Sequence, residues 1–350
     1  MIRINMRSTA GRIKGQGVGS CYEEQVGLMK RLLPAEFSIT ENRIGKFDIE
    51  HYHTINPAYL LERMLTRRDT VGIGYVHFLP ETLEESLRLP CKRIVYKYLL
   101  AFYNSMDYLV TVNPFFIPKL RALGVTRPKV LYIPNFVSDR DFYPVTGAER
   151  AEIRKRYGIG ADDFVVLGVG QLQTRKGVLD FVKTAARLPE CVFLWAGGFS
   201  FGKLSDGYAE IKKLTETPPE NVRFLGITSR TEMPKLYNLA DVFFLPSYDE
   251  LFPMSILEAM CCKLPVLVRD ISLYQSILEN ACLTGRDPAS FADAIGRLGR
   301  DPGFYSNWRE KAWQCHLRYS EERALDEWRQ LYEIAYAEAR TGGAGAAALG

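Results

Sequence analysis

Short apolar runs alternate with amphipathic segments along the first 135 residues. Runs rich in β-branched and aromatic residues predict strands, and apolar residues at helical spacing predict helices. The predicted strands are residues 2–6, 47–55, 70–78, 107–113 and 129–135, and the predicted helices are 20–33, 91–105 and 114–124. This alternation predicts a mostly parallel sheet with helices on both faces.

The same alternation begins again after residue 160. Residues 137–160 read as a linker and an entry helix. Further strands are predicted at 163–170, 192–198, 222–227, 242–246 and 264–270, and a long helix at 322–340. We therefore predict an α/β fold with two doubly wound, Rossmann-like domains that face each other across a crevice. The predicted parts are 1–140, 141–320, a C-terminal helix at 321–340 that packs back on the first domain, and a disordered tail at 341–350.

Composition adds few constraints to this prediction. A length of 350 residues suits two domains. The seven cysteines are scattered without a C-x-x-C pair, which favours reduced thiols over a zinc site or disulfides. No apolar run approaches the roughly 18 residues of a membrane span, and the N-terminus lacks the apolar core of a secretory signal. We expect a cytoplasmic protein.

The net charge of +4 is unevenly distributed. Residues 1–140 carry 20 Lys and Arg against 13 Asp and Glu, a balance of +7, while residues 141–350 carry 25 against 28, a balance of −3. A basic N-terminal half suits an anionic membrane or nucleic acid, and a solvated surface explains it equally well.

In each predicted domain, one glycine-containing loop follows the first strand. KGQGVGS (14–20) brings Gly17 and Gly19 to a helix start, where backbone approaches an anion closely, although a simple turn fits as well. GVGQLQTRKG (168–177) carries Gly170, Gln171, Arg175 and Lys176. Its cations suit a diphosphate, and a solvated basic turn is the alternative.

The segment ELFPMSILEAM (250–260) places two glutamates around an apolar stretch. Glu250 follows a predicted buried strand, and Pro253 suits the first turn of a helix. Glu258 is the one charged residue between Phe252 and Cys262, so we expect a buried carboxylate that needs hydrogen-bond donors such as ligand hydroxyls. Free N–H groups at the helix start suit phosphate. Surface glutamates are the alternative.

Histidines and paired aspartates give weaker signals. His77 lies at the end of a predicted strand. Its side chain either faces the crevice or has a structural role. His51 and His53 alternate on a predicted strand, without a third ligand at a fitting spacing, so they read as strand residues. Asp139 and Asp141 form a D-x-D in the linker, which is a poor place for metal-binding carboxylates. We predict no metal.

Several of these motifs, in this order, resemble one known family. E-x7-E with G-x-G-x-L-x-x-x-K-G upstream is similar to the retaining glycosyltransferases of the GT-B fold, family 4, over residues 2–335. The stretches KGQGVGS, GYVHFLPETLEESL, IPNFVS and GQLQTRKGVLDF resemble bacterial α-galactosyl-glucosyl-diacylglycerol synthases. The resemblance implies transfer of a hexose, expected to be galactose, from a UDP-sugar to a glucosyl-diacylglycerol, without a cofactor or metal, on the cytoplasmic face of the membrane.

The resemblance also implies roles for individual residues. Glu250 would hold the transferred sugar and Glu258 the ribose, while Lys176 would neutralise the diphosphate and His77 would lie beside the sugar. The further donor-binding positions are Gly17, Gly19, Gly170, Gln171, Arg175, Gly226, Ile227, Phe252, Pro253, Met254 and Ser255. Most members have arginine where this chain has Gln171, so Arg175 is the candidate for the missing charge.

The acceptor and the class of function keep alternatives. Basic and apolar residues alternate in helix 91–105, with Arg63, Arg67 and Arg68 nearby, which suits an anionic membrane surface, although core packing explains the apolar positions equally well. A soluble saccharide is the alternative acceptor. A non-catalytic membrane-surface adaptor is the alternative from another class, and it leaves the two glutamates and Lys176 unexplained.

Overall fold

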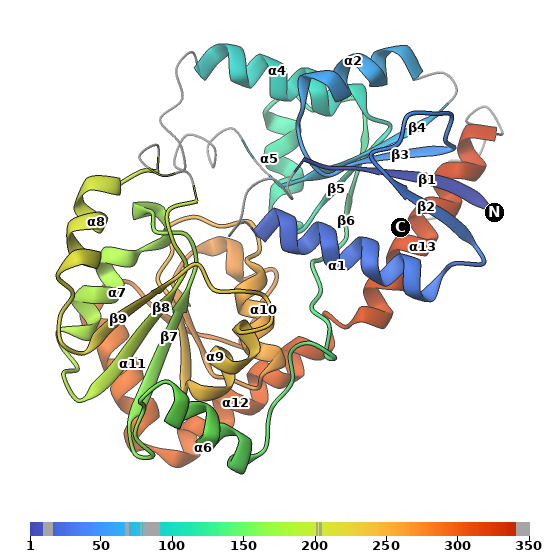
Figure 1. The fold of residues 1–350 in the computed structure, drawn as a ribbon. Helices are drawn as coiled ribbons and strands as arrows, with labels where there is room; N and C mark the ends of the chain where they lie inside the picture. Colours follow the sequence, from blue (N-terminus) through green and yellow to red (C-terminus); the bar gives the residue numbers. More distant parts are fainter. Residues whose placement is uncertain are drawn as a thin grey trace.

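Two parallel sheets organise the chain (Figure 1). The computed structural model describes residues 1–9, 17–66, 70–77, 79, 92–200, 202 and 205–340. Within this described part, each sheet has six strands, in the orders β2-β1-β3-β4-β5-β6 and β12-β11-β10-β7-β8-β9. Helices flank both sheets, so the predicted α/β fold with two doubly wound domains is confirmed.

The first sheet belongs to the N-terminal part of the chain. Its strands are β1 (Ile2–Arg7), β2 (Phe37–Glu41), β3 (Ile49–Tyr52), β4 (Val71–Val76), β5 (Tyr108–Thr111) and β6 (Lys129–Tyr132). Its helices are α1 (Gly17–Leu32), α2 (Pro57–Thr66), α4 (Lys92–Ser105) and α5 (Phe116–Ala122). All residues of β3, β4 and β5 are buried, as expected for strands covered on both faces.

The second sheet begins after the linker. Its strands are β7 (Phe164–Val169), β8 (Cys191–Ala196), β9 (Val222–Gly226), β10 (Val242–Leu245), β11 (Val266–Arg269) and β12 (Leu283–Gly285). The α-helices are α6 (Gly147–Arg156), α7 (Val178–Ala185), α8 (Tyr208–Glu216), α9 (Met233–Leu239), α10 (Met254–Cys261), α11 (Pro288–Arg300) and α12 (Pro302–Leu317). Two 3-10 helices, η2 (Thr174–Lys176) and η4 (Ser272–Tyr274), follow β7 and β11.

The last helix, α13 (Glu321–Arg340), lies beside the first sheet (Figure 1). The Tyr332 hydroxyl lies 2.7 Å from Nδ1 of His51 in β3, and Lys129 Nζ of β6 lies 2.7 Å from the Glu338 carboxylate. The exact domain boundaries stay a prediction. The tail 341–350 lies outside the described residues.

The sequence prediction did not name strands β2 and β12 or helix α2, and it placed the start of α1 too late. β2 and β12 each lie at one edge of their sheet, are only partly buried and lack a continuous apolar run. Helix α1 begins at Gly17 rather than residue 20. Among the described residues, no helix combines the length and apolar character that crossing a bilayer requires.

Candidate active site

Several predicted site residues lie where strands of the second sheet end. β7, β8, β9, β10 and β11 run parallel, so their carboxyl ends meet at one edge of the sheet. Residues 170–177 follow β7, Gly226 ends β9 and Ile227 follows it, and residues 246–253 follow β10. The topology therefore gathers the loops of three predicted motifs at the same edge.

The loop after β7 is folded so that Lys176 faces the end of β10. The indole N–H of Trp195 donates to the carbonyl of Gly170 at 3.0 Å, which fixes the start of the loop. Gly177 has a left-handed φ of 72°, and a Cβ there would lie 2.2 Å from the carbonyl oxygen of Pro246. Only glycine fits this position, because backbone and strand end approach so closely.

Lys176 and Arg175 both pair with Glu250. The Lys176 ammonium contacts one carboxylate oxygen, and Arg175 Nη1 lies 3.6 Å from the other. Glu250 is only 5% exposed. Burial alone would raise the pKa of the Glu250 carboxyl, but the charges of Lys176 and Arg175 hold that pKa below its ordinary value. The carboxylate is therefore ionised at neutral pH and held in a fixed place beside two cations.

Burial also changes Lys176. It lowers the pKa of the ammonium, and the neighbouring charge of Arg175 adds to this effect, while Glu250 opposes it. A cation that is already stripped of water and aimed by a carboxylate interacts strongly with an incoming anion. This arrangement suits stabilisation of a departing phosphate.

Helix α10 begins directly after this cluster, as the sequence predicted. Pro253 is its N-cap residue with extended backbone angles (φ −71°, ψ 129°), and no side chain caps the first turn. Met254 and Phe252 are buried, whereas Ser255 is partly exposed. The first N–H groups of α10 thus lie close in sequence to Glu250, in a position that suits an anion.

Glu258 is buried at 5% exposure, as predicted, but it is not solitary. Its carboxylate accepts a hydrogen bond from the Tyr237 hydroxyl at 2.6 Å and pairs with Arg230. Arg230 also pairs with Glu24 of α1, and it lies over the ring of Phe142 at 4.4 Å. The sequence suggested ligand hydroxyls as donors to this carboxylate, and the structure adds two protein donors, Tyr237 of α9 and Arg230 of the loop before it.

His77 follows β4 in a stack of aromatic rings. Its ring centroid lies 4.3 Å from that of Tyr75 and 6.0 Å from that of His53. Burial lowers the pKa of His77 to about 3, so the imidazole is neutral. Tyr75 donates to Asn135 at 3.2 Å, and Asn135 donates to the carbonyl of Phe252 at 3.0 Å. His77 is thereby connected to the segment that follows Glu250.

The remaining predicted positions are spread around this edge. Gly226 ends β9 with φ 72°, and the side chain of Ile227 is half exposed beside Gly198. Gly17 and Gly19 belong to the first turn of α1, which packs against α10; residues 14–16 of that motif lie outside the described residues. Gln171 follows Gly170 and is partly buried.

Four contributors to this region escaped the sequence prediction: Arg230, Tyr237, Asn113 and Asn135. Tyr237 lies in LYNLADVFFLPS (236–247) and Asn135 in IPNFV (133–137), and a polar residue next to apolar neighbours was the available signal in both. Asn113, between Val112 and Pro114, carried the same signal, whereas Arg230 did not. The partners of both were not predictable, because the groups they bind come from distant parts of the chain.

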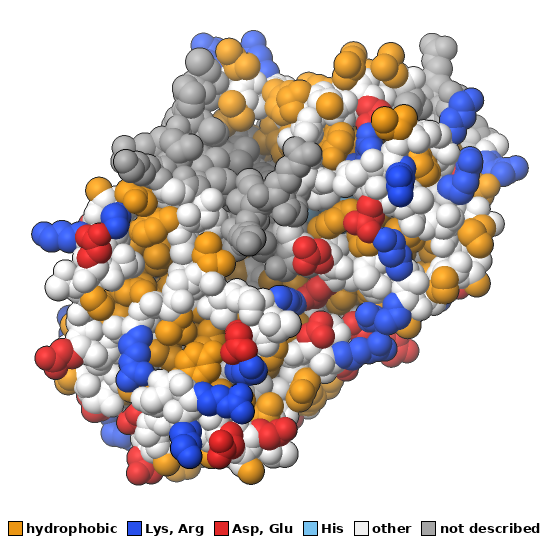
Figure 2. All heavy atoms as spheres, viewed as in Figure 1, with side chains coloured by type: hydrophobic (Ala, Val, Ile, Leu, Met, Phe, Trp, Pro, Cys, Tyr) orange, Lys and Arg blue, Asp and Glu red, His pale blue; other side chains and the backbone are white. Residues whose placement is uncertain are grey.

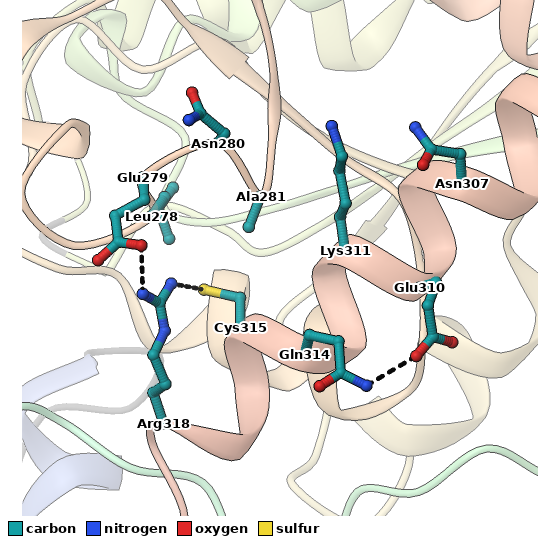
Figure 3. A pocket seen from close by; sticks show the side chains of 10 residues that line it. All are labelled: Leu278, Glu279, Asn280, Ala281, Asn307, Glu310, Lys311, Gln314, Cys315 and Arg318. Atoms are coloured by element: carbon teal, nitrogen blue, oxygen red, sulfur yellow. Dashed lines mark hydrogen bonds and ion pairs between the residues drawn. The ribbon is translucent and has the colours of Figure 1, made fainter.

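A separate pocket of about 480 Å³ lies between residues 278–281 and α12 (Figure 3). Several of its polar groups pair with one another. Arg318 is held by Glu279 at 2.5 Å and lies 3.2 Å from Cys315 Sγ, and Gln314 donates to Glu310 at 2.8 Å. None of the predicted site residues lines it among the residues described, so we assign the candidate site to the strand ends.

The two parallel six-stranded sheets with flanking helices define a two-domain fold of the GT-B type. A sucrose-phosphate synthase from Thermosynechococcus elongatus superposes with a TM-score of 0.81 at 19% identity, covering 96% of this chain and 100% of that one. The Anabaena protein HepE, solved with UDP and glucose, superposes with a TM-score of 0.77 at 15% identity, over 95% and 100% of the two chains. These likenesses support the fold.

Sequence relatives define the family. The model of the glycosyl transferases group 1 matches residues 149–314. An alpha-galactosylglucosyldiacylglycerol synthase from Streptococcus pneumoniae is 44% identical over 95% of this chain and 89% of its own length. A processive diacylglycerol alpha-glucosyltransferase from Acholeplasma laidlawii is 29% identical over 82% and 84%. The chain belongs to the group 1 glycosyl transferases and is a hexosyltransferase.

Proposed function

We propose that this enzyme transfers galactose from UDP-galactose to a glucosyl-diacylglycerol, with retention at the anomeric carbon. The observation that carries the proposal is the Lys176–Glu250–Arg175 cluster before α10, in which the carboxylate is buried and the two cations are largely covered. Support for the lipid acceptor comes from the two relatives that are named for diacylglycerol glycolipids. The UDP-sugar is a co-substrate, and no cofactor is proposed.

In the proposed reaction, the anomeric carbon loses its bond to the β-phosphate oxygen of UDP and gains one to the acceptor oxygen on the same face. The acceptor proton passes to the departing diphosphate. Lys176, Arg175 and the first amides of α10 stabilise the charge that develops there, which is why no metal is proposed. Glu250 orients Lys176 and accepts hydrogen bonds from hydroxyls of the sugar, and Glu258 accepts hydrogen bonds from hydroxyls of the ribose. His77 lies beside the sugar.

Gly17 and Gly19 close over the diphosphate from α1, and Gly226 and Ile227 lie beside the base in this proposal. Gly170 and Gln171 follow the strand end that faces the phosphates, with Arg175 supplying the charge that Gln171 lacks. Phe252, Pro253, Met254 and Ser255 contribute backbone groups around the sugar and phosphates.

We also propose that the protein binds the cytoplasmic face of the membrane through α2 and α4. Leu61, Met64 and Leu65 of α2 are 61%, 67% and 79% exposed, and Ile94 of α4 is 68% exposed. Figure 2 shows hydrophobic side chains gathered along the top of the view, over these two helices. Arg93 is exposed on α4 beside them. Apolar side chains next to a cation suit an anionic bilayer surface.

This surface differs from the one expected from the sequence. Leu99 and Phe102 of α4 belong to the core, so the apolar face of that helix is mostly core packing. Arg63 is fully buried and pairs with Asp107, so it adds no charge to the surface. Arg67 and Arg68 lie outside the described residues. The exposed apolar residues come mainly from α2, which the sequence prediction did not include.

The test of the function is UDP release by the purified protein. UDP-galactose and UDP-glucose are each supplied with and without glucosyl-diacylglycerol in anionic vesicles, and soluble glucosides serve as competing acceptors. The expected result is release from UDP-galactose that requires the glycolipid. Release that requires a soluble saccharide would replace the lipid acceptor, and binding of vesicles without any turnover would favour the adaptor.

Membrane binding is tested by vesicle flotation. Leu61→Ser combined with Leu65→Ser is expected to reduce binding to anionic vesicles by about tenfold or more, because each buried leucine contributes about 1.5–3 kcal/mol. Leu317→Ser is the matched control, since Leu317 is 49% exposed but lies in α12 of the other sheet's domain. Equal flotation of wild type, the double variant and Leu317→Ser would contradict the proposed membrane surface. It would also be contradicted if the wild type formed a dimer that the double variant does not form.

A further inference from the structure

Asn113, which follows β5, is fully buried between the two halves of the molecule. Its Nδ2 donates to the carbonyls of Leu251 and Leu273, both at 3.1 Å. Its Oδ1 accepts from the backbone N–H of Phe115 at 3.0 Å and from the Ser276 hydroxyl at 2.9 Å. Both ends of the amide are therefore occupied, and the amide has one orientation that satisfies all four contacts.

Asn135, which follows β6, is 5% exposed and makes an equivalent contact. Its Nδ2 donates to the carbonyl of Phe252 at 3.0 Å. Its Oδ1 accepts from the Tyr75 hydroxyl at 3.2 Å and lies 3.1 Å from Cys21 Sγ. The amide is again fixed by groups of the N-terminal half, so its donor has to face the C-terminal half.

These two amides bind consecutive carbonyls of one short segment. Residues 251 and 252 connect Glu250 to Pro253, the N-cap residue of α10. Since a peptide group is planar, fixing the carbonyl of Leu251 also fixes the N–H of Phe252, and fixing the carbonyl of Phe252 sets the entry into α10. The N-terminal half thereby determines the geometry of a segment that belongs to the C-terminal half.

We propose that Asn113 and Asn135 are positioning residues for the donor site. They hold residues 251–252 so that the Glu250 carboxylate and the first amides of α10 keep the relative placement that a bound sugar diphosphate requires. This inference rests on the proposed function for its effect on turnover. It also assigns a role to the crevice between the two halves: the donor segment has its catalytic geometry only while the N-terminal half is docked against it.

The physical argument favours asparagine at both positions. Each site needs a donor toward a carbonyl and an acceptor toward neighbouring donors, and among side chains of this length only the asparagine amide supplies both in a plane. Aspartate keeps the shape and the acceptor but turns a carboxylate oxygen toward the carbonyl. A buried carbonyl left without its donor costs about 1–3 kcal/mol, enough to release the segment.

The test compares Asn113→Asp and Asn135→Asp with a matched control, Asn221→Asp. Asn221 Nδ2 donates to the carbonyls of Ala185 and Leu188, each at 3.0 Å, and of Cys191 at 3.2 Å, so it makes the same kind of contact within the second domain alone. Thermal unfolding is measured for all variants, and hydrogen exchange is followed in the peptide covering residues 247–256. kcat and KM for the UDP-sugar complete the set.

The two interface variants are expected to speed exchange in residues 250–256 by about tenfold. They are also expected to lower kcat/KM for the UDP-sugar by about 10- to 100-fold. The Asn221→Asp variant is expected to lower the melting temperature similarly while leaving both quantities near wild type. Unchanged exchange in both interface variants would overturn the inference, and so would faster exchange with unchanged kcat/KM. Absence of wild-type turnover with every donor would refute the proposed function instead, and the exchange data would still decide whether the amides hold the segment.

Discussion

Two buried histidines, His51 and His53, and the partly buried His77 make acid stability the sharpest physical prediction. His51 and His53 lie 4.2 Å apart, and His77 stacks on Tyr75 within the same group of rings. Burial lowers the pKa of His51 and of His77 to about 3, with the nearby His77 adding to the effect on His51, and it lowers the pKa of His53 as well. Each ring is therefore neutral in the folded protein at pH 5, whereas the unfolded chain takes up protons below about 6.5.

The sign and size of the effect follow from this difference. The unfolded state binds more protons than the folded state at acidic pH. The histidines therefore leave the free energy of unfolding undiminished above pH 6.5 and lower it progressively as the pH falls toward 3. When the pH falls from 7 to 5, a histidine whose pKa is about 6.5 in the unfolded chain and about 3 in the folded protein lowers the free energy of unfolding by about 2 kcal/mol. Glu50 acts in the opposite direction, because burial raises its pKa to about 7. The folded state then takes up a proton first and gains about 2 kcal/mol over the same range.

The assay removes one histidine, so that the contributions of all other titrating groups cancel when the variant is compared with wild type. Urea unfolding of wild type and His51→Asn is measured at pH 7 and pH 5. We expect the loss of unfolding free energy on acidification to be smaller in the variant by about 2 kcal/mol. Tyr332→Phe is the control, because it removes the hydroxyl 2.7 Å from His51 Nδ1 but keeps the imidazole. Equal pH dependence of wild type and His51→Asn would refute the reasoning.

Three further changes test the site. Glu250→Gln is expected to lower kcat about 100-fold with little change in UDP affinity, measured by steady-state kinetics and calorimetry. Glu258→Gln is expected to weaken UDP binding about tenfold instead, so equal effects of the two variants on UDP affinity would contradict their separate roles. Gly177→Ala is expected to cost about 2 kcal/mol or more in urea unfolding, since its Cβ would meet the carbonyl of Pro246. Wild-type stability would refute the required left-handed turn.

The order of elements was predictable because the central strands are buried on both faces. Strands such as β4 and β10 are continuous apolar runs bounded by polar turns, and such runs carry a strong local signal. The motif residues after them were predictable for the same reason, since a charged or glycine-rich stretch at a strand end stands out. Lys176 and Glu250 were found in this way, and the structure pairs them directly.

What sequence patterns could not supply was the set of partners. Glu258 looked solitary because its neighbours along α10 are apolar, yet Arg230 and Tyr237 reach it from residues more than 20 positions away. Arg63 looked like a surface cation, but it is buried and pairs with the carboxylate of Asp107, 44 residues further along the chain. Local periodicity describes which face of an element is apolar and says nothing about which distant side chain meets a polar one.

The same reasoning explains why the two halves of the site depend on each other. Most of the proposed donor-binding groups belong to the second sheet's half, but the backbone that joins Glu250 to α10 is held by Asn113 and Asn135 from the first. At the other end of α10, Arg230 links Glu258 to Glu24 of α1. Both ends of the E-x7-E element are therefore tied to the N-terminal half. Movement of that half away from the second sheet would loosen both ends of this element together, which would couple the proposed binding of the donor to closure of the crevice.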